Sequence, residues 1–312
     1  MFLSPSVFSY VADGIHVEKL LNWVKASILI LYLFTKADYH TLFFPIAMFA
    51  LVAGPIQQPI HILTTAVWIW IHQLQCNINN QLVSISEDKD NKPWRPLPAG
   101  RITSPQAQQL HGVVTILCLL LSTIGGYKMV VASAALMFTC LLYDQGRGSA
   151  HWMERIPLVV LMYGIFEYGS TRVISKPLYP SLDETARTAI ISSLAVIATT
   201  AHIGDFPDVE GDAADGRSTI PIAFPRSSRI FTPLLFLGWS VYMVNMWDLG
   251  KISASLCVGL GSLVAGRNWF YCDKVNDKMT YKLHSVSGLL HSSFGHVLIN
   301  YSYGSLLSTS CP

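Results

Sequence analysis

Long apolar segments alternate with short polar ones along almost the whole chain. Apolar runs occupy residues 60–76, 110–124, 129–142, 157–168 and 188–200. A helix needs about 20 mostly apolar residues to cross the hydrocarbon core of a bilayer, and these runs can form the centres of such helices. The pattern therefore predicts an all-α, polytopic membrane protein.

The polar breaks divide the chain into about nine predicted spans. These spans are centred on residues 42–54, 60–80, 105–124, 127–143, 156–171, 186–203, 230–247, 252–266 and 284–306. Residues 1–35 lack the basic start and compact apolar core of a cleaved signal. We expect them to form a cytosolic and interfacial lead-in to a transmembrane domain over residues 36–312.

Composition agrees with this prediction, since 51% of the residues are hydrophobic and 13% are charged, against about 25% charged residues in soluble domains. The net charge of +2 is too small to indicate nucleic-acid binding. The six cysteines contain no CxxC pair, so the sequence indicates neither a disulfide framework nor a zinc site.

Basic residues are distributed unevenly between the two predicted sides of the membrane. Sixteen of the 21 Lys and Arg residues lie near the N-terminus or in the polar segments after the second, fourth, sixth and eighth spans. By the positive-inside bias, these segments face the cytosol.

The polar segment of residues 80–101 follows the second span. Asn80, Ser84 and Asp88 are spaced by four residues, and Glu87 follows Asn80 by seven, so all four would share one face of a continuous helix. The segment continues as NKPWRPLPAGR. Taken alone, such a segment is usually a solvated loop between spans.

A second acidic segment, residues 205–221, follows the sixth span. The spacing of Asp205, Asp208 and Asp212 predicts three carboxylates stacked on one helical face. Such carboxylates repel each other unless a cation neutralises them. Mg²⁺ takes oxygen ligands, usually one or two carboxylates completed by water and substrate phosphate. A helix cap with surface carboxylates is the alternative interpretation.

Basic residues flank both acidic segments. Lys92 and Arg95 follow the first, Arg217 follows the second, and Arg147 follows the fourth span. Acidic ligands for metal beside basic ligands for phosphate are the composition of a diphosphate site. With an apolar cavity inside the bundle, the predicted ligand is a prenyl diphosphate bound with Mg²⁺.

At these residues the chain resembles the UbiA superfamily of intramembrane prenyltransferases. The first motif of that family, NDxxDxxxD running into NKPxRP, is matched in part by Asn80, Ser84 and Asp88 with NKPWRP. Its second motif, DxxDxxGD, is matched by DFPDVEGD, and a Tyr with a basic residue four positions later by Tyr143 and Arg147. The resemblance implies nine helices around a central cavity, with two Mg²⁺ bridged by diphosphate.

The chain departs from the family pattern at two places. Gln81 and Ser84 stand where the family has Asp, and Glu87 is a candidate for supplying the missing oxygen. In the turn GRST at residues 216–219, the basic residue is shifted by one position. The pattern NQxxSxxED with NKPWRPLP is similar to a fungal branch that includes membrane-bound terpene cyclases. That likeness implies secondary metabolism and an endoplasmic reticulum membrane, while the charge bias places the acidic motifs on the cytosolic side.

The motifs and the resemblance together give expected roles to twelve residues. Metal binding is expected of Asn80, Glu87, Asp88, Asp205, Asp208 and Asp212. Diphosphate binding is expected of Lys92, Arg95, Arg147 and Arg217. Catalytic roles are expected of Arg95, Tyr143, Arg147 and Glu167.

Glu167 places a carboxylate within the fifth apolar segment. An acid inside a membrane helix is a functional candidate by default, here for stabilising a carbocation or removing the final proton. The nearby Arg172 leaves open that Glu167 only reaches the membrane boundary.

Aromatic rings of the second and fifth spans are further candidates, because ring faces stabilise cations. They are Trp68, Trp70, Tyr163, Phe166 and Tyr168, and packing or lipid contact would explain each of them too. His72 and Gln73 are expected to form hydrogen bonds between helices rather than to line the cavity.

The sequence leaves several functions open. A terpene cyclase would ionise farnesyl diphosphate and close the cation on itself, whereas a prenyltransferase would pass it to an aromatic or other acceptor. Carboxylates clustered at helix ends on one side disfavour a transporter, and Ser84 is the feature consistent with an inactive scaffold. The expected partners are the prenyl diphosphate and the lipid bilayer, without nucleic acid or a protein partner.

Overall fold

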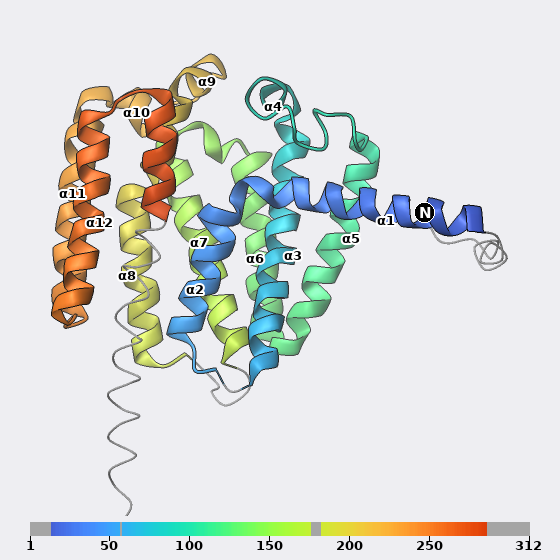
Figure 1. The fold of residues 1–312 in the computed structure, drawn as a ribbon, viewed down its shortest axis with the longest axis horizontal. Helices are drawn as coiled ribbons and strands as arrows, with labels where there is room; N and C mark the ends of the chain where they lie inside the picture. The colour runs from blue at the N-terminus through green and yellow to red at the C-terminus, as the bar shows by residue number, and fades with distance from the viewer. Residues whose placement is uncertain (1–13, 57, 176–181, 286–312) are drawn as a thin grey trace, which may run out of the picture.

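A computed structural model describes residues 14–56, 58–175 and 182–285, and most of them are helical (Figure 1). The long helices are α1 (Gly14–Thr35), α2 (Phe44–Ala53), α3 (Pro59–Val83), α5 (Ser104–Ser122), α6 (Tyr127–Asp144), α7 (Trp152–Ile174), α8 (Glu184–Thr200), α11 (Pro225–Met246) and α12 (Lys251–Phe270). Residues 274–285 are also helical. The shorter elements are η2 (Lys36–Asp38), η3 (Tyr39–Phe43), α4 (Ile85–Asn91), η4 (Thr123–Gly125), η5 (Gly148–Ala150), η6 (Ala201–Asp208), α9 (Val209–Ala214) and α10 (Ile220–Ala223).

The first eight predicted spans coincide with helices of the structure. The first falls on η3 and α2, and the next seven on α3, α5, α6, α7, α8, α11 and α12. The ninth, at residues 284–306, lies almost wholly outside the described residues, so the predicted count of nine is not confirmed. By length and apolar composition alone, four helical stretches of the described residues can cross a membrane: Val17–Ala53, Ser104–Gly125, Tyr127–Asp144 and Glu184–Ala214.

Local sequence signals define several helix ends. Thr103 caps α5 in a capping box with Gln106, so both side chains satisfy backbone N–H groups that the first turn leaves unpaired. Asp183 caps α8 by accepting a hydrogen bond from the backbone N–H of Ala186 at 2.7 Å. These caps place the helix starts at the polar breaks seen in the sequence.

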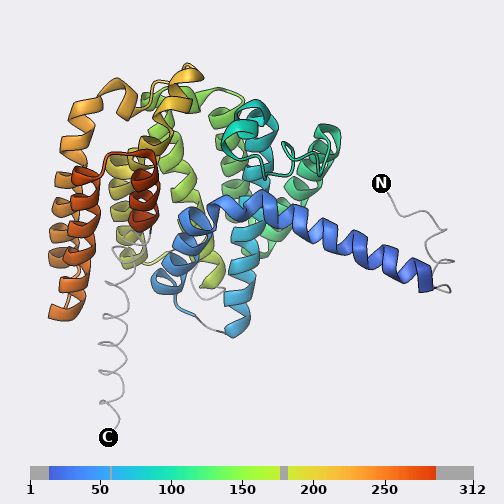
Figure 2. The same ribbon diagram turned by 45° about the horizontal axis from the view of Figure 1, so that its top comes forward.

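The long helices pack into one bundle around a central space. Helix α3 contacts α5, α6 and α7, while α7 also packs against α2 and α8. Helices α11 and α12 form a pair that joins the rest through α8. Helix α1 extends away from the bundle in both views (Figures 1 and 2). Only its last residues are buried, including Leu33, Phe34 and Thr35.

The outer faces of the bundle are strongly apolar. Val113, Ile116 and Leu120 on α5 are each more than half exposed. An exposed apolar surface of this kind is a liability in water but is suited to lipid contact. The short helices α4, α9 and α10 gather at one end of the bundle (Figure 1), so the two acidic segments share one end, as the sequence predicts.

Candidate functional site

The first acidic segment is divided between two helices. Helix α3 ends at Val83, and the hydroxyl of Ser84 donates hydrogen bonds to the backbone oxygen of Asn80 at 3.0 Å and to Asp88 Oδ2 at 3.2 Å. The chain then turns into α4. The predicted continuous helix is therefore wrong, because Asn80 belongs to α3, whereas Glu87 and Asp88 belong to α4. Ser84 nevertheless contacts both Asn80 and Asp88, as their four-residue spacing predicts.

Asp88 is engaged in a buried ion pair with Arg95. Arg95 Nη1 lies 2.7 Å from both carboxylate oxygens of Asp88, and both side chains are almost fully buried. Arg95 lines the central cavity, and Asp88 is not among the lining residues. This arrangement fits Asp88 better to holding the guanidinium in place than to binding a metal.

The second acidic segment changes its helix type between its carboxylates. Asp205 and Asp208 lie on the 3₁₀ helix η6, whereas Asp212 lies on α9. Side chains three residues apart eclipse each other in a 3₁₀ helix, and both Asp205 and Asp208 line the cavity. Asp212 is outside this lining, so the predicted stack of three carboxylates is wrong.

The turn after α9 positions Arg217. Gly216 adopts a left-handed φ of 69°, and the N–H groups of Gly216 and Arg217 bond to the carbonyls of Ala213 and Asp212 at 3.1 and 2.8 Å. This is the Schellman pattern of helix ends, for which glycine is favoured. The turn brings the Arg217 side chain back over α9.

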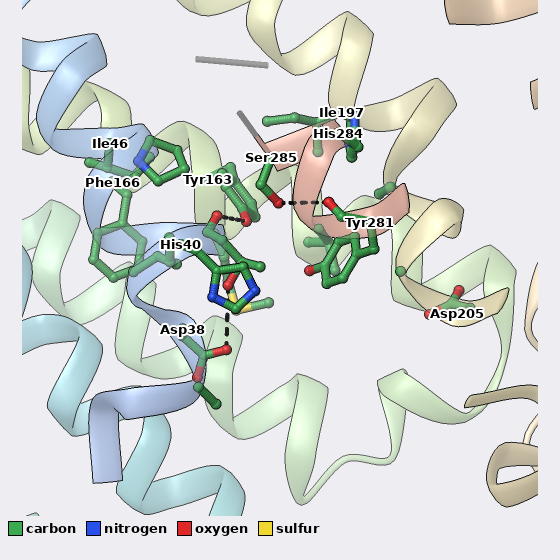
Figure 3. A pocket seen from close by; sticks show the side chains of 18 of the residues that line it. Asp38, His40, Ile46, Tyr163, Phe166, Ile197, Asp205, Tyr281, His284 and Ser285 are labelled. Carbon is green, nitrogen blue, oxygen red and sulfur yellow. Dashed lines mark hydrogen bonds between the residues drawn. The ribbon is translucent and has the colours of Figure 1, made fainter. Parts of the chain in front are cut away.

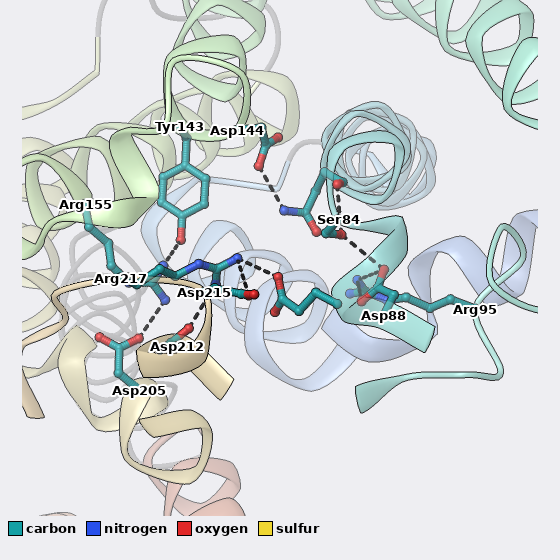
Figure 4. A network of polar contacts seen from close by, with 12 residues as sticks. Ser84, Asp88, Arg95, Tyr143, Asp144, Arg155, Asp205, Asp212, Asp215 and Arg217 are labelled. Atoms are coloured by element: carbon teal, nitrogen blue, oxygen red, sulfur yellow. Dashed lines mark hydrogen bonds and ion pairs between the residues drawn. The ribbon is translucent and has the colours of Figure 1, made fainter. Parts of the chain in front are cut away.

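Arg217 joins the two acidic segments (Figure 4). Its Nη1 donates to Asp212 at 3.0 Å and its Nη2 to Glu87 at 2.5 Å. Burial lowers the pKa of Arg217, but the carboxylates of Glu87 and Asp212 oppose this effect, and the net pKa is raised. Glu87 is therefore an ion-pair partner across the site, and its role as the missing oxygen ligand of the first motif stays a prediction.

Arg155, at the start of α7, holds a second group of polar side chains. Its Nη1 donates to the Tyr143 hydroxyl at 2.5 Å, and its Nη2 donates to Asp205 at 2.6 Å. All three residues line the cavity. A short parallel backbone bridge between His151 and Ser218 fixes the start of α7 beside the turn that carries Arg217.

Asp144, at the end of α6, orients Asn80. Its carboxylate accepts hydrogen bonds from Asn80 Nδ2 at 2.9 Å and from Asn79 Nδ2 at 2.6 Å. An ionised carboxylate only accepts, so Asn80 must turn its amide nitrogen toward Asp144. Its amide oxygen is then free to act as a ligand at the cavity.

The cavity has a volume of about 570 Å³, within the ~300–1,000 Å³ typical of small-molecule sites. One part is polar and is lined by Asn80, Lys92, Arg95, Tyr143, Asp144, Arg155, Asp205 and Asp208. Another part is largely apolar and is lined by Ile46, Phe49, Phe166, Ala189, Val196 and Met243. Figure 3 shows side chains from several helices converging on this space.

Glu167 lines the same cavity from α7. Its side chain is buried, and Oε1 accepts a 2.5 Å hydrogen bond from the Ser193 hydroxyl on α8. Its Oε2 is buried without a hydrogen-bond partner among the described residues. The structure therefore places a carboxylate inside the bundle, rather than at its boundary.

The remaining candidates separate into lining and packing residues. Tyr163 and Phe166 line the cavity, whereas Trp68, Trp70 and Tyr168 are outside the lining. His72 bonds to Ser133 on α6, and Gln73 to the backbone of Thr35, which confirms the expected interhelical hydrogen bonds. Arg147 is exposed in a left-handed turn and outside the lining.

Sequence reasoning missed Arg155, Asp144, Lys278 and Lys282, all of which line the cavity. Asp144 directly follows Tyr143 of the third motif, and this position next to a predicted site residue could have indicated it. Arg155 opens the fifth span as one charge among several in its loop. Lys278 and Lys282 share one face of a helix, but the sequence does not show whether that face points to the cavity or away from it.

The polar part of the cavity supplies separate oxygen donors. Among the described residues, no group of three or more His, Cys, Asp and Glu side chains forms a self-contained metal site. Asn80, Asp205 and Asp208 line the polar part together, and Asp208 has no ion-pair partner within the described chain. This set suits Mg²⁺, which completes its coordination with water and phosphate.

Known proteins similar to the chain include enzymes of two kinds. Fumagillin beta-trans-bergamotene synthase of Aspergillus fumigatus is 28% identical over 236 residues, covering 72% of this chain and 79% of that protein. A polyprenyl transferase of Hericium erinaceus is 29% identical over 190 residues, covering 60% and 62%. A solved UbiA homolog from Archaeoglobus fulgidus, bound to GPP and Mg²⁺, superposes with a TM-score of 0.63 at 15% identity, covering 87% of this chain and 99% of that one.

The fold and the site define an all-α, polytopic membrane protein with an internal cavity that is charged in one part and apolar in another. The family model of the UbiA prenyltransferase family matches residues 42–293. The chain belongs to this family. It is a membrane-bound enzyme of the terpene synthase or prenyltransferase type.

Proposed function

We propose that this enzyme ionises a prenyl diphosphate, most suitably farnesyl diphosphate, in a Mg²⁺-dependent step and closes the cation to a cyclic terpene hydrocarbon. The observation that carries the proposal is the cavity, which joins a charged part to an apolar part within one continuous space. A prenyl diphosphate has the same division, since an anionic head is joined to a hydrocarbon tail.

The polar part supports binding of the diphosphate head. Lys92, Arg95 and Arg155 bring three cations to the cavity. Arg95 keeps its buried Nε unpaired among the described residues, although Asp88 holds its Nη1. Fixed cations stabilise negative charge as it develops on a leaving diphosphate. The hydroxyl of Tyr143, held by Arg155, adds a hydrogen-bond donor.

The oxygen donors of the polar part fit Mg²⁺. Asn80, through its amide oxygen, and the carboxylates of Asp205 and Asp208 would hold it. When bound, Mg²⁺ neutralises phosphate oxygens and so makes diphosphate a better leaving group. Asp205 also accepts from Arg155, so the same carboxylate links the cation-binding and diphosphate-binding groups.

The apolar part supports cyclisation. The C–O bond breaks with its electron pair on the diphosphate, and the hydrocarbon cation must then be kept from water until it closes. Phe166 and Tyr163 present rings to the cavity, and ring faces stabilise cations. Glu167 would accept the final proton from the carbon beside the cation, so that the C–H electrons form the new double bond.

A prenyltransferase is the second candidate. A bergamotene synthase and a polyprenyl transferase resemble the chain at 28% and 29% identity, so identity does not separate the two functions. Both reactions release a proton, from the hydrocarbon in a cyclase and from the acceptor in a transferase; the carboxylate beside the apolar walls suits removal of a proton from the hydrocarbon itself. We also propose an endoplasmic reticulum membrane with the acidic segments facing the cytosol and a place in secondary metabolism.

The test is incubation of membranes that contain the protein with Mg²⁺ and farnesyl diphosphate alone, followed by analysis for volatile hydrocarbons. A cyclic hydrocarbon is expected, and chelation of Mg²⁺ by EDTA should abolish it. Asp208→Asn should lower its formation by about 100-fold or more. The matched control is Glu210→Gln, because Glu210 is exposed on α9 and outside the cavity lining.

Failure to form hydrocarbon from farnesyl, geranyl or geranylgeranyl diphosphate would contradict the cyclase. Prenylation of an added aromatic acceptor under those conditions would establish the transferase instead. Absence of diphosphate release under every condition would indicate an inactive scaffold.

A further inference from the structure

The helical segment of residues 274–285 lies against the cavity and contributes side chains from one face. Lys278, Tyr281, Lys282 and Ser285 all line the cavity. Residues separated by three, four and seven positions share one face of a helix. Figure 3 shows Tyr281 and Ser285 of this segment around the same cavity as Asp205.

Contacts of two neighbouring side chains, Asn276 and Asp277, fix the rotation of this helical segment about its own axis. The buried Asp277 accepts two hydrogen bonds from Arg229 on α11, at 2.7 and 2.6 Å. Asn276 accepts another from Arg267 on α12 at 3.0 Å. With Asp277 committed to α11, the adjacent face that carries Lys278 and Lys282 is directed to the cavity.

Arg229, which binds Asp277, also contacts the second acidic segment. The guanidinium of Arg229 lies 3.9 Å from the centre of the Phe206 ring, and Phe206 stands between the cavity-lining Asp205 and Asp208. Gly204 packs so close to the Tyr281 ring that an added Cβ would lie 3.1 Å from it. The segment and η6 therefore form one packed unit at the cavity.

The two lysines are not committed to other side chains. Within the part of the chain that the structure describes, neither Lys278 nor Lys282 has an ion-pair or side-chain hydrogen-bond partner. Both remain exposed at the cavity. Arg155 and Arg95 are already bound to Asp205 and Asp88, so the lysines supply positive charge that the protein does not itself neutralise.

We infer that Lys278 and Lys282 form a further part of the diphosphate-binding site, brought to the cavity by the segment of residues 274–285. The inference rests on the proposed function and deepens it. The ammonium groups bind oxygens of the diphosphate head from the side of η6, and they continue to bind the diphosphate after the C–O bond has broken.

The test is titration of the purified full-length protein in detergent with inorganic pyrophosphate in the presence of Mg²⁺, followed by calorimetry. Lys278→Ala and Lys282→Ala should each weaken binding about tenfold, and the double variant should weaken it further. Lys→Arg at each position should restore most of the binding, because the charge is kept. Lys274→Ala is the matched control, since Lys274 is exposed on the same segment but outside the cavity lining.

Two further outcomes separate this inference from the proposed function. Binding by the double alanine variant within about twofold of the unmutated protein would overturn the lysine assignment while leaving diphosphate chemistry intact. Absence of pyrophosphate binding by the unmutated protein would overturn both. Size-exclusion profiles identify any variant that has lost its fold. If an alanine variant has done so, pyrophosphate binding by the arginine variants is compared with that of the unmutated protein instead.

Discussion

Glu167 brings a carboxylate to a cavity wall that it shares with apolar side chains such as Phe166 and Val196. Ser193 satisfies one carboxylate oxygen and leaves the other without a partner among the described residues. A buried carboxylate without full hydrogen bonding is costly, which is the condition under which a proton acceptor at the substrate is useful. The proposed role of Glu167 as a proton acceptor can therefore be tested with the nearly isosteric substitution Glu167→Gln.

We expect Glu167→Gln to lower formation of the normal hydrocarbon by about 100-fold, because a carboxamide cannot accept the proton and general bases contribute ~10²–10⁴-fold. Pyrophosphate release should fall much less, because Glu167 does not contact the polar part. Gas chromatography and a pyrophosphate assay on the same sample give both values. An unchanged product spectrum would contradict the assigned role.

Individual residues of the site were predictable to different degrees. Asp205, Asp208 and Asn80 could be selected because oxygen-bearing side chains recur there at short intervals and match the two UbiA motifs. Arg155 and Asp144 could not, because their roles depend on contacts made across the bundle, such as Asp144 with Asn80, 64 positions apart in the chain. Sequence spacing predicts which side chains are neighbours on one helix, but it does not predict which helices pack against each other.

At the scale of elements, the Glu87–Arg217 ion pair connects α4 with the turn after α9. Both side chains are about a quarter exposed, so solvent screens the pair only partly. Asp212 shares the same guanidinium. The two acidic segments are thus held together by protein charges as well as by any ligand that they bind.

A double-mutant cycle with Glu87→Gln and Arg217→Gln should give a coupling free energy of about 1 kcal/mol. We expect Glu87→Gln alone to lower the thermal midpoint by ~2–4 °C, measured by unfolding in detergent. Glu210→Gln, on the exposed side of α9, serves as the control and should leave the midpoint unchanged. Strict additivity of the two substitutions would show that the pair contributes nothing to stability.

The long helices were more predictable than the short ones. Apolar runs located α2, α3, α5, α6, α7, α8, α11 and α12 because lipid contact and helix packing both require them. The 3₁₀ helix η6 was not predicted, although Pro207 gives a physical reason for it, since proline cannot donate the backbone hydrogen bond that continues an α-helix. That local change decided which carboxylates face the cavity.

At the scale of the whole molecule, the helices of the bundle line a cavity of about 570 Å³. Helix α8 has one side on the cavity, with Ala189, Ser193 and Val196, and another side facing outward, where Ile191 is 68% exposed. The same helix therefore offers positions that reduce the cavity and positions that do not.

We expect Val196→Phe to shift the preference of the enzyme from farnesyl toward geranyl diphosphate by about tenfold or more, because a filled pocket discriminates against each added carbon by ~1–3 kcal/mol. The ratio of kcat/KM for the two diphosphates measures this change. Ile191→Phe should leave the ratio unaltered. Equal ratios in both variants would show that this part of the cavity does not hold the hydrocarbon.

The two parts of the cavity are carried by different kinds of element. Asn80, Lys92, Asp144 and Asp208 lie at helix ends or in the short connections, whereas Phe166, Glu167 and Val196 lie within long helices. Under the proposed function, substitutions in the walls would alter the fate of the hydrocarbon while the charged groups stay in place. Such a division would make the scaffold readily evolvable, because new products would require changes only inside the helices, and it gives enzyme engineering a set of wall positions to vary separately from the charged residues.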